Sequence, residues 1–300
     1  MIRATTIDDT SQLDRIRRTV FPWWVPSVAA QEKMFAYDPP DARYLRLVAE
    51  VDGVVAGFGW AGFNTSTSEA GAGSGTVTVH PDHRKSGVGK ALYDRLEDHL
   101  REIGVRRAQA FALDDANTLE WMERRGWERG ASARFSMVDP RELPPMPPVP
   151  EGVTLVNLGA ITAEQAYELD AAMSDEPGDV PSDNWSFDDF KNRIWEDPDL
   201  DFEMSTVALV DGELACFTNV QANHATGRCW SGGTATLAQF RGRGLAKVVK
   251  SEALRKAARG GITAALTAND YSNGPMLAVN DWLGYKVIAS EHSMLKTIGD

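Results

Sequence analysis

Hydrophobic positions in the first half of the chain shift between the two-residue spacing of strands and the 3.6-residue spacing of helices. The pattern predicts a strand, two helices, a hairpin, a strand, a helix, a strand, a helix and closing strands. Their ranges are Ile2–Thr5, Ser11–Val20, Gln31–Ala36, Tyr44–Val51 with Val54–Phe63, Thr76–Val79, Val88–Ile103, Arg107–Ala112, Ala116–Arg125 and Trp127–Val138. Asp52-Gly53 is a strong turn signal inside the hairpin.

The second half repeats this order element by element. The predicted ranges are Thr154–Asn157, Ala163–Met173, Phe187–Trp195, Thr206–Val210 with Glu213–Gln221, Cys229–Leu237, Leu245–Arg259, Ile262–Ala268, Pro275–Leu283 and Tyr285–Leu295. A repeat of this length indicates an internal duplication. The mixture of hairpins, single strands and helices predicts an α+β fold with a mixed, mostly antiparallel sheet flanked by helices.

A proline-rich segment lies at the midpoint of the chain. Six prolines fall between Pro140 and Pro150, which excludes a helix or a central strand there and predicts a stiff, extended linker. We therefore expect an N-terminal domain at 1–139, a linker at 140–151 and a C-terminal domain at 152–300. A length of 300 residues fits two domains, each able to bury a core.

Composition narrows the class of protein. The formal net charge of −12 disfavours partners such as nucleic acid or anionic membranes, which bind clustered Lys and Arg. No apolar run reaches the ~18 residues of a membrane span, and the N-terminus has no apolar signal segment. Only two cysteines occur, which fits a reducing compartment, so we expect a cytoplasmic protein. Cys216 and Cys229 are too few for a disulfide framework or a zinc site; we expect them on neighbouring strands as core residues, and we expect no metal.

One loop motif occurs in both halves and carries the candidate chemistry. Arg84–Gly89 and Arg241–Ala246 each follow a β-branched run and open a helix with the pattern Arg-x-x-Gly-x-Gly/Ala. Glycines let the backbone approach a ligand, and a helix start offers unpaired N–H groups to a phosphate. Neither copy ends in the Gly-Lys-Ser/Thr of a P-loop, and both follow a hairpin rather than a first strand, as a Rossmann fingerprint would. A pyrophosphate site in a mixed α+β domain remains.

On these motifs, each half resembles an N-acetyltransferase of the GNAT superfamily, whose signature is this loop between the fourth strand and the third helix. A second family element is an Asn before the fourth helix and an aromatic after its closing Gly. It occurs as Asn117 with Gly126-Trp127 and as Asn273 with Gly284-Tyr285. The resemblance implies two tandem acyl-CoA N-acyltransferase domains, acetyl-CoA as the acyl donor, a small-molecule amine as the acceptor, and a monomer or homodimer.

The resemblance also implies which residues bind the coenzyme. The fourth strand of each half would separate from the fifth and bind the pantetheine arm, and the loop would hold the pyrophosphate. The implied cofactor-binding residues are Val77, Val79, Arg84, Lys85, Ser86, Gly87, Val88, Gly89, Asn117, Ala235, Leu237, Arg241, Gly242, Arg243, Gly244, Leu245, Ala246 and Asn273.

Both halves depart from the family where a general acid is expected. Many members place a Tyr four residues before the closing Gly, but here that position holds Met122 and Asn280. Asn280 can only donate a hydrogen bond. Together with Asn273 and with Asp270, which follows the fifth strand, Asn280 forms our set of candidate catalytic residues, all in the second half.

The segment between the first two helices, which shapes the acceptor pocket in this family, differs between the halves. The second half runs from Asp170 to Glu203 with twelve carboxylates against two basic residues. Carboxylates at an acceptor mouth attract cations, which favours the second half for catalysis on a cationic amine; the alternative is a solvated loop. Two other functions stay open: a non-catalytic acyl-CoA-binding sensor or sequestering protein, and an acetyltransferase of protein N-termini.

Overall fold

A computed structural model describes residues 1–39, 41–173 and 179–299. The N-terminal half follows the predicted order of elements. Its elements are β1 (Ile2–Ala4), α1 (Thr10–Val20), α2 (Val28–Ala36), β2 (Leu45–Val51), β3 (Val54–Phe63), β4 (Ala72–Val79), α3 (Val88–Ile103), β5 (Arg107–Leu113), α4 (Ala116–Glu123) and β6 (Glu128–Val138). The α+β fold class is confirmed, and the main difference is that β4 begins at Ala72 rather than Thr76.

The C-terminal half repeats this order, as predicted. Its elements are β7 (Val153–Asn157), α5 (Ala163–Ala171), α6 (Phe187–Phe190), β8 (Thr206–Val210), β9 (Glu213–Asn223), β10 (Arg228–Thr236), α7 (Leu245–Arg259), β11 (Ala264–Asp270), α8 (Gly274–Leu283) and β12 (Lys286–Thr297). The helix expected at Phe187–Trp195 is α6 followed by a π-helical turn over Lys191–Trp195. Cys216 and Cys229 are buried, free thiols on the neighbouring strands β9 and β10, as expected.

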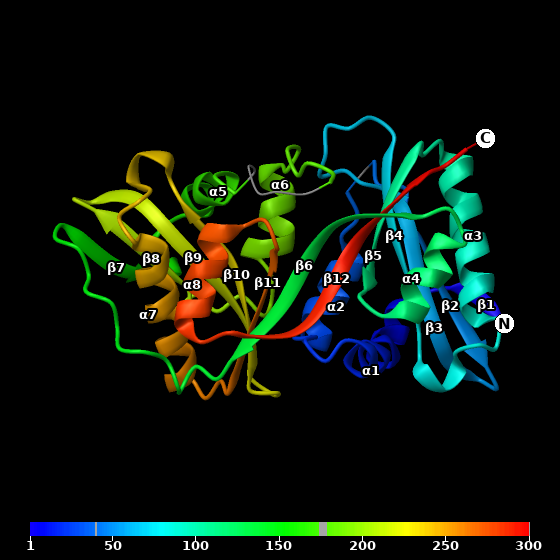
Figure 1. Cartoon of the computed structure of the whole chain (residues 1–300), viewed down its shortest axis with the longest axis horizontal. Coiled ribbons are helices and arrows are strands. Elements are labelled where there is room, and N and C mark those ends of the chain that lie inside the picture. The colour runs from blue at the N-terminus through cyan, green and yellow to red at the C-terminus, as the bar shows by residue number, and fades with distance from the viewer. Residues whose placement is uncertain (40, 174–178, 300) are drawn as a thin grey trace.

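The two halves share one twelve-stranded sheet in the order β1-β2-β3-β4-β5-β12-β6-β11-β10-β9-β8-β7. In Figure 1, β6 and β12 run side by side through the middle of the molecule, with α3 and α4 on one side and α7 and α8 on the other. The last strand of each half has changed places: β12 pairs with β5 of the N-terminal half, and β6 pairs with β11 of the C-terminal half.

This strand exchange means that the sheet does not divide where the sequence suggests. The proline-rich segment has no helix or strand, as predicted, but it runs from β6 to β7 along the C-terminal half, where Pro144 accepts a hydrogen bond from Arg255. The chain instead crosses between the halves before β6 and before β12. The domain boundaries 1–139 and 152–300 therefore remain a proposal. With these boundaries, each domain contributes one strand to the sheet of the other.

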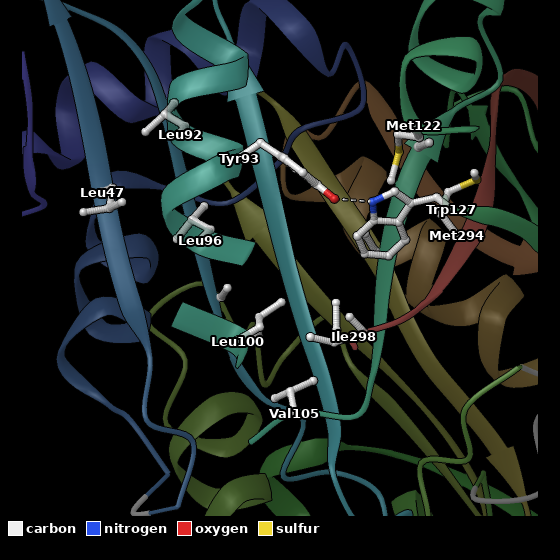
Figure 2. Packing of buried hydrophobic residues seen from close by; sticks show 14 of the residues in the cluster. Leu47, Leu92, Tyr93, Leu96, Leu100, Val105, Met122, Trp127, Met294 and Ile298 are labelled. Carbon is white, nitrogen blue, oxygen red and sulfur yellow. Dashed lines mark hydrogen bonds between the residues drawn. The ribbon is translucent and has the colours of Figure 1, made fainter. Parts of the chain in front are cut away.

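The exchanged strand β12 is part of the N-terminal core. Figure 2 shows Met294 and Ile298 among Leu92, Leu96, Leu100 and Trp127, the first three of which lie on α3. Burying a side chain of this size contributes about 1.5–3 kcal/mol. Residues far apart in the sequence thus stabilise the N-terminal half.

Candidate functional site

The two Arg-x-x-Gly-x-Gly/Ala loops have the same backbone shape. The second position of each is left-handed, Lys85 with φ 61° and Gly242 with φ 79°. The glycine that caps the following helix is also left-handed, Gly87 with φ 90° and Gly244 with φ 75°. These conformations turn the loop sharply and leave the first N–H groups of α3 and α7 free for a ligand.

The arginine that opens each motif has a structural contact. Arg84 Nε donates to the carbonyl oxygen of Val79 (3.4 Å), and Arg241 Nε donates to that of Thr236 (3.1 Å). Each side chain ties its loop back to the end of the preceding strand.

Both halves open their sheet beside the loop. β4 pairs with β5 only from Ala72 to Ser74, and β10 pairs with β11 only from Arg228 to Trp230. From there to the end of β4 and β10, one backbone edge has no partner strand in the described parts of the chain. An unpaired edge needs hydrogen-bond partners, and the resemblance predicted that the pantetheine arm would supply them.

In the N-terminal half the separation of the strands is a cleft of about 920 Å³. We call it the donor cleft. Seven of the predicted cofactor-binding residues line it: Val77, Val79, Arg84, Lys85, Gly87, Gly89 and Asn117. Ser86 and Val88 lie in the same loop outside the lining, and Ser86 Oγ donates to the carbonyl oxygen of His83 (2.6 Å). The cleft passes between β4 and β5 and reaches Phe21 and Trp60.

Tyr93 is a residue of this cleft that sequence reasoning missed. Its hydroxyl accepts hydrogen bonds from Trp127 Nε1 (3.0 Å) and from Lys296 Nζ (3.0 Å). Figure 2 shows the hydroxyl directed at Trp127, close to Met122. With two donors on its oxygen, the hydroxyl directs its own proton elsewhere. In the sequence, Tyr93 stands among leucines at helical spacing and looks like a core residue.

Lys296 reaches Tyr93 from the exchanged strand. Its ammonium also forms an ion pair with Glu97 on α3. Burial lowers the pKa of Lys296, but the contacts with Glu97 and Tyr93 outweigh burial and raise it. The phenol of Tyr93 therefore lies beside a stable positive charge.

Glu291 is a second missed residue. It faces Leu113 across the β12–β5 pair, and Leu113 lines the donor cleft. Met294 and Lys296 point toward α3, so alternation along the strand turns Glu291 to the opposite face, where Leu113 packs against the cluster that contains Trp23 and Phe135. Burial raises the pKa of Glu291 to about 7.

The opening between β10 and β11 contains protein contacts. Thr267 Oγ1 donates to the carbonyl oxygen of Ser231 (3.1 Å), and the buried Lys250 donates to Ser231 Oγ (3.0 Å). The first of these bonds crosses from β11 to β10 where the two strands stop pairing. The other predicted residues of this half, Ala235, Leu237, Arg243, Leu245 and Ala246, lie on the strand end, the loop and the start of α7.

The three candidate catalytic residues all have structural contacts. Asn273 caps α8 by accepting from the backbone N–H of Met276 (3.3 Å). Asp270 accepts from the backbone and the hydroxyl of Ser272. Asn280 is buried and donates to Asn269 Oδ1 (2.6 Å). Nothing in this geometry tests a catalytic role, so the three remain candidates for the case in which transfer takes place in the C-terminal half.

The acidic stretch contacts the N-terminal half. Asp179 accepts from the backbone N–H of Ala131, Asp183 from that of Ser68, and Asp199 from that of Ser27. Glu196 pairs with Lys33. Asp175 and Glu176 lie outside the described residues. The carboxylates on which the preference for the second half rests thus hold the two halves together.

Within the described ranges no group of three or more His, Cys, Asp and Glu is arranged to hold a metal. None of the helices described is long and apolar enough to cross a membrane.

Comparison with known proteins gives three kinds of match. The model of the acetyltransferase (GNAT) family matches residues 11–127. A mycothiol acetyltransferase from Thermomonospora curvata is 31% identical over 253 residues, which cover 81% of this chain and 79% of that protein.

Two solved structures share the whole fold. A tandem GNAT protein from the clavulanic acid biosynthesis pathway superposes with a TM-score of 0.78 at 19% identity, covering 100% of this chain and 99% of the other. A GCN5-related N-acetyltransferase from Sphaerobacter thermophilus gives a TM-score of 0.74 at 19% identity, with coverage of 100% and 96%. At this identity the two structures show a common architecture.

Proposed function

Because the chain belongs to the GNAT family of acetyltransferases, we propose that it transfers the acetyl group of acetyl-CoA to a primary amine of a small molecule, and that the transfer takes place in the donor cleft. The family match and the relative support an N-acetyltransferase with acetyl-CoA as donor. The acceptor and the choice of site are our proposal.

One observation carries the choice of site: the donor cleft joins the features that a coenzyme A thioester needs. The loop and the start of α3 offer amide groups to a pyrophosphate. The edge of β4 beyond Ser74 pairs with no strand among the described residues and could bond the pantetheine arm. The volume of about 920 Å³ is in the range of cofactor sites.

In the reaction, the amine nitrogen attacks the thioester carbonyl carbon, the new C–N bond forms and the C–S bond breaks. The nitrogen loses one proton and the departing thiolate gains one. We propose a backbone amide near Val79, at the end of β4, as the hydrogen-bond donor to the developing oxyanion.

Tyr93 is our candidate for the proton donor to the thiolate. Its hydroxyl proton is not used in the bonds from Trp127 and Lys296, so it is available to the departing thiolate. The family position for this acid holds Met122, which lines the same cleft. A tyrosine on α3 would thus do what a tyrosine on α4 does elsewhere in the family.

Glu291 is our candidate for accepting the proton from the amine. It lies on the face of the sheet opposite α3, beside Leu113, which lines the donor cleft. A carboxyl with a pKa of about 7 can accept a proton near neutral pH.

For the C-terminal half we propose coenzyme binding without turnover. Its loop has the same shape, but the bond from Thr267 to Ser231 crosses the opening that the pantetheine arm would use. The alternative of a non-catalytic acyl-CoA-binding protein is therefore kept for this half alone.

The relative's name suggests the first acceptor to test, an amine from the chemistry of mycothiol. A cationic acceptor has less support than the acidic stretch suggested, because Asp179, Asp183 and Asp199 of that stretch make contacts between the halves. A cytoplasmic location and a monomeric or homodimeric state remain predictions.

The matched variants Gly87→Ala and Gly244→Ala test the proposal. Neither new methyl group meets an atom within 4 Å, so each change acts only through a left-handed backbone. We expect Gly87→Ala to weaken acetyl-CoA binding in isothermal titration and to slow CoA release with an amine, and Gly244→Ala to leave the release rate intact. Loss of release in Gly244→Ala alone would move the transfer to the second half. No binding of acetyl-CoA by the unmodified chain would overturn the acetyltransferase proposal.

A further inference from the structure

A second cavity lies between the two halves. It has a volume of about 380 Å³ and is lined by α1, α2, β2 and β3 of the N-terminal half and by the Trp185–Pro198 region of the C-terminal half. We call it the interdomain pocket. Trp60 lines both this pocket and the donor cleft, so the two cavities share a wall.

The polar groups of the interdomain pocket are mostly donors set among aromatic rings. The guanidinium of Arg17 lies 5.1 Å from the Trp24 ring centre and 4.7 Å from that of Phe58. The guanidinium of Arg193 lies 5.9 Å from the Tyr37 ring and 5.6 Å from the Trp185 ring. Rings on both sides of a cation hold it in place and keep water away from it.

Neither guanidinium has a carboxylate partner in the parts of the chain that the structure describes. Arg17 donates to the neutral amide oxygen of Gln31 (2.5 Å), and Arg193 has only its ring contacts. Burial lowers the pKa of Arg17 to about 10, although the nearby charge of Asp14 raises it. The indole N–H of Trp24 is buried and has no acceptor among the described residues. Buried donors of this kind gain from an acceptor.

The remaining charges of the pocket do not supply that acceptor. Arg46 is paired with Asp38, and Lys33 with Glu196. Asp197 also lines the pocket, but its carboxylate accepts the backbone N–H of Asp199 and makes no ion pair with the described residues. In a chain of net charge −12, the pocket thus keeps two guanidinium groups that form no ion pair with any residue the structure describes.

We propose that the interdomain pocket is the acceptor pocket of the N-terminal site, and that it selects amines that also carry an acidic group beside a planar or apolar ring. The proposal rests on the proposed function, because it gives the amine substrate of the same site its chemical class. Arg17, Arg193 and the indole N–H of Trp24 bind the acidic group, since guanidinium forks match a carboxylate. The rings bind the apolar part, and the amine would reach the thioester past Trp60, which lines both cavities.

Matched amines test this selection on the full chain. L-phenylalanine and L-phenylalaninamide differ in the acidic group, and the amide has the less basic amine, so amine reactivity alone favours the amide. We expect a KM at least about tenfold lower for the acid, the worth of one charged hydrogen bond. Arg17→Gln and Arg193→Gln should each remove the difference in KM, because each raises only the KM of the acid. Arg15 is exposed on the same helix as Arg17, and we expect the control variant Arg15→Gln to keep the difference in KM.

A binding measurement that needs no acetyl transfer separates the two levels of failure. 3-Phenylpropionate has the ring and the carboxylate but no amine, and Trp24, Trp60 and Trp185 would report its binding by fluorescence. We expect it to bind the unmodified chain and Arg15→Gln, and to lose at least about tenfold in affinity in Arg17→Gln. Equal KM values for L-phenylalanine and its amide would overturn the pocket's role even if both amines are acetylated. Binding of 3-phenylpropionate that Arg17→Gln leaves unchanged would do the same. If 3-phenylpropionate binds but no amine causes CoA release from acetyl-CoA, the result would instead count against the proposed function.

Discussion

The hydroxyl of Tyr93 lies where side chains from both halves of the chain meet. Trp127 and Lys296 both donate to it, and Glu97 fixes the ammonium of Lys296. The pair of donors would hold the phenol in one orientation, with its own proton directed away from both donors.

Replacing Tyr93 by Phe should therefore lower kcat about a hundredfold and leave the KM for acetyl-CoA nearly unchanged, because general-acid assistance acts in the transition state. Steady-state CoA release measures both constants. Tyr271→Phe is the control, since that tyrosine is exposed and its hydroxyl bonds Ser290 alone among the residues that the structure describes. If Tyr93→Phe keeps the full kcat, the phenol has only a packing role.

Glu291 gives the protein a pH dependence of stability. Below pH 4.5 its carboxyl is protonated in both the folded and the unfolded chain, and the group has no effect. Between pH 4.5 and about 7 the Glu291 carboxyl loses its proton in the unfolded chain but keeps it in the folded chain. The free energy of unfolding therefore falls as the pH rises through this range. The loss is roughly 3 kcal/mol at most, because each tenfold change in protonation is worth about 1.4 kcal/mol.

Glu291→Gln removes this loss. We expect the variant to be more stable than the unmodified chain in urea unfolding at pH 8, and to match it near pH 4.5. The exposed Glu213→Gln should show no such pH-dependent difference. If the difference in free energy of unfolding between Glu291→Gln and the unmodified chain is the same at both pH values, the carboxyl is well solvated.

At the scale of elements, the two loops differ in one residue that the backbone makes important. Lys85 and Gly242 occupy the same left-handed position, and both are exposed. Only glycine adopts this conformation without strain, and another residue costs on the order of 1 kcal/mol.

Reciprocal substitutions measure that strain. Lys85→Gly should stabilise the chain and Gly242→Lys should destabilise it, each by about 1 kcal/mol, because a Cβ at Gly242 meets no atom within 4 Å. Urea unfolding of the two variants gives both values. Changes of the same sign would show that the loops differ by more than this one conformation.

Most elements of the fold could be predicted from the sequence, because hydrophobic spacing and turn residues act locally. The range Val88–Ile103 was predicted to the residue, and both Asp-Gly hairpins formed. The exchange of β6 and β12 could not be predicted. Both segments have the composition of strands, and the choice of partner depends on contacts with residues more than a hundred positions away.

The same limit applies to the candidate site. The loops, the separated strands and seven lining residues followed from a motif, since a motif is local. Tyr93, Lys296 and Glu291 did not, because their importance depends on where the exchanged strand lies. The acidic stretch was misleading for a related reason: its carboxylates find partners on the other half.

At the scale of the whole molecule, strand exchange predicts how the chain behaves when it is cut. Cleavage after Met146 gives fragments 1–146 and 147–300, and each carries the strand that completes the other's sheet. Alone, each would expose an unpaired strand edge and lose part of its core. We expect neither to unfold cooperatively, and an equimolar mixture to recover a single thermal transition and acetyl-CoA binding.

Circular dichroism on heating and isothermal titration measure the two recoveries. A chain in which residues 1–127 continue through a Gly/Ser linker into 286–299 restores β12 to the N-terminal sheet, and we expect it to fold alone. Cooperative unfolding of each separate fragment, without association on mixing, would show that the exchanged strands are dispensable.

The exchanged strands also bear on how such a gene can change over generations. In a duplicated gene, one copy is ordinarily free to decay once the other suffices. Here a premature stop codon anywhere before Lys286 would also remove β12, with Lys296, from the N-terminal half. Purifying selection for a folded first copy therefore also acts on the codons of β12 in the second copy, so the two copies are retained together.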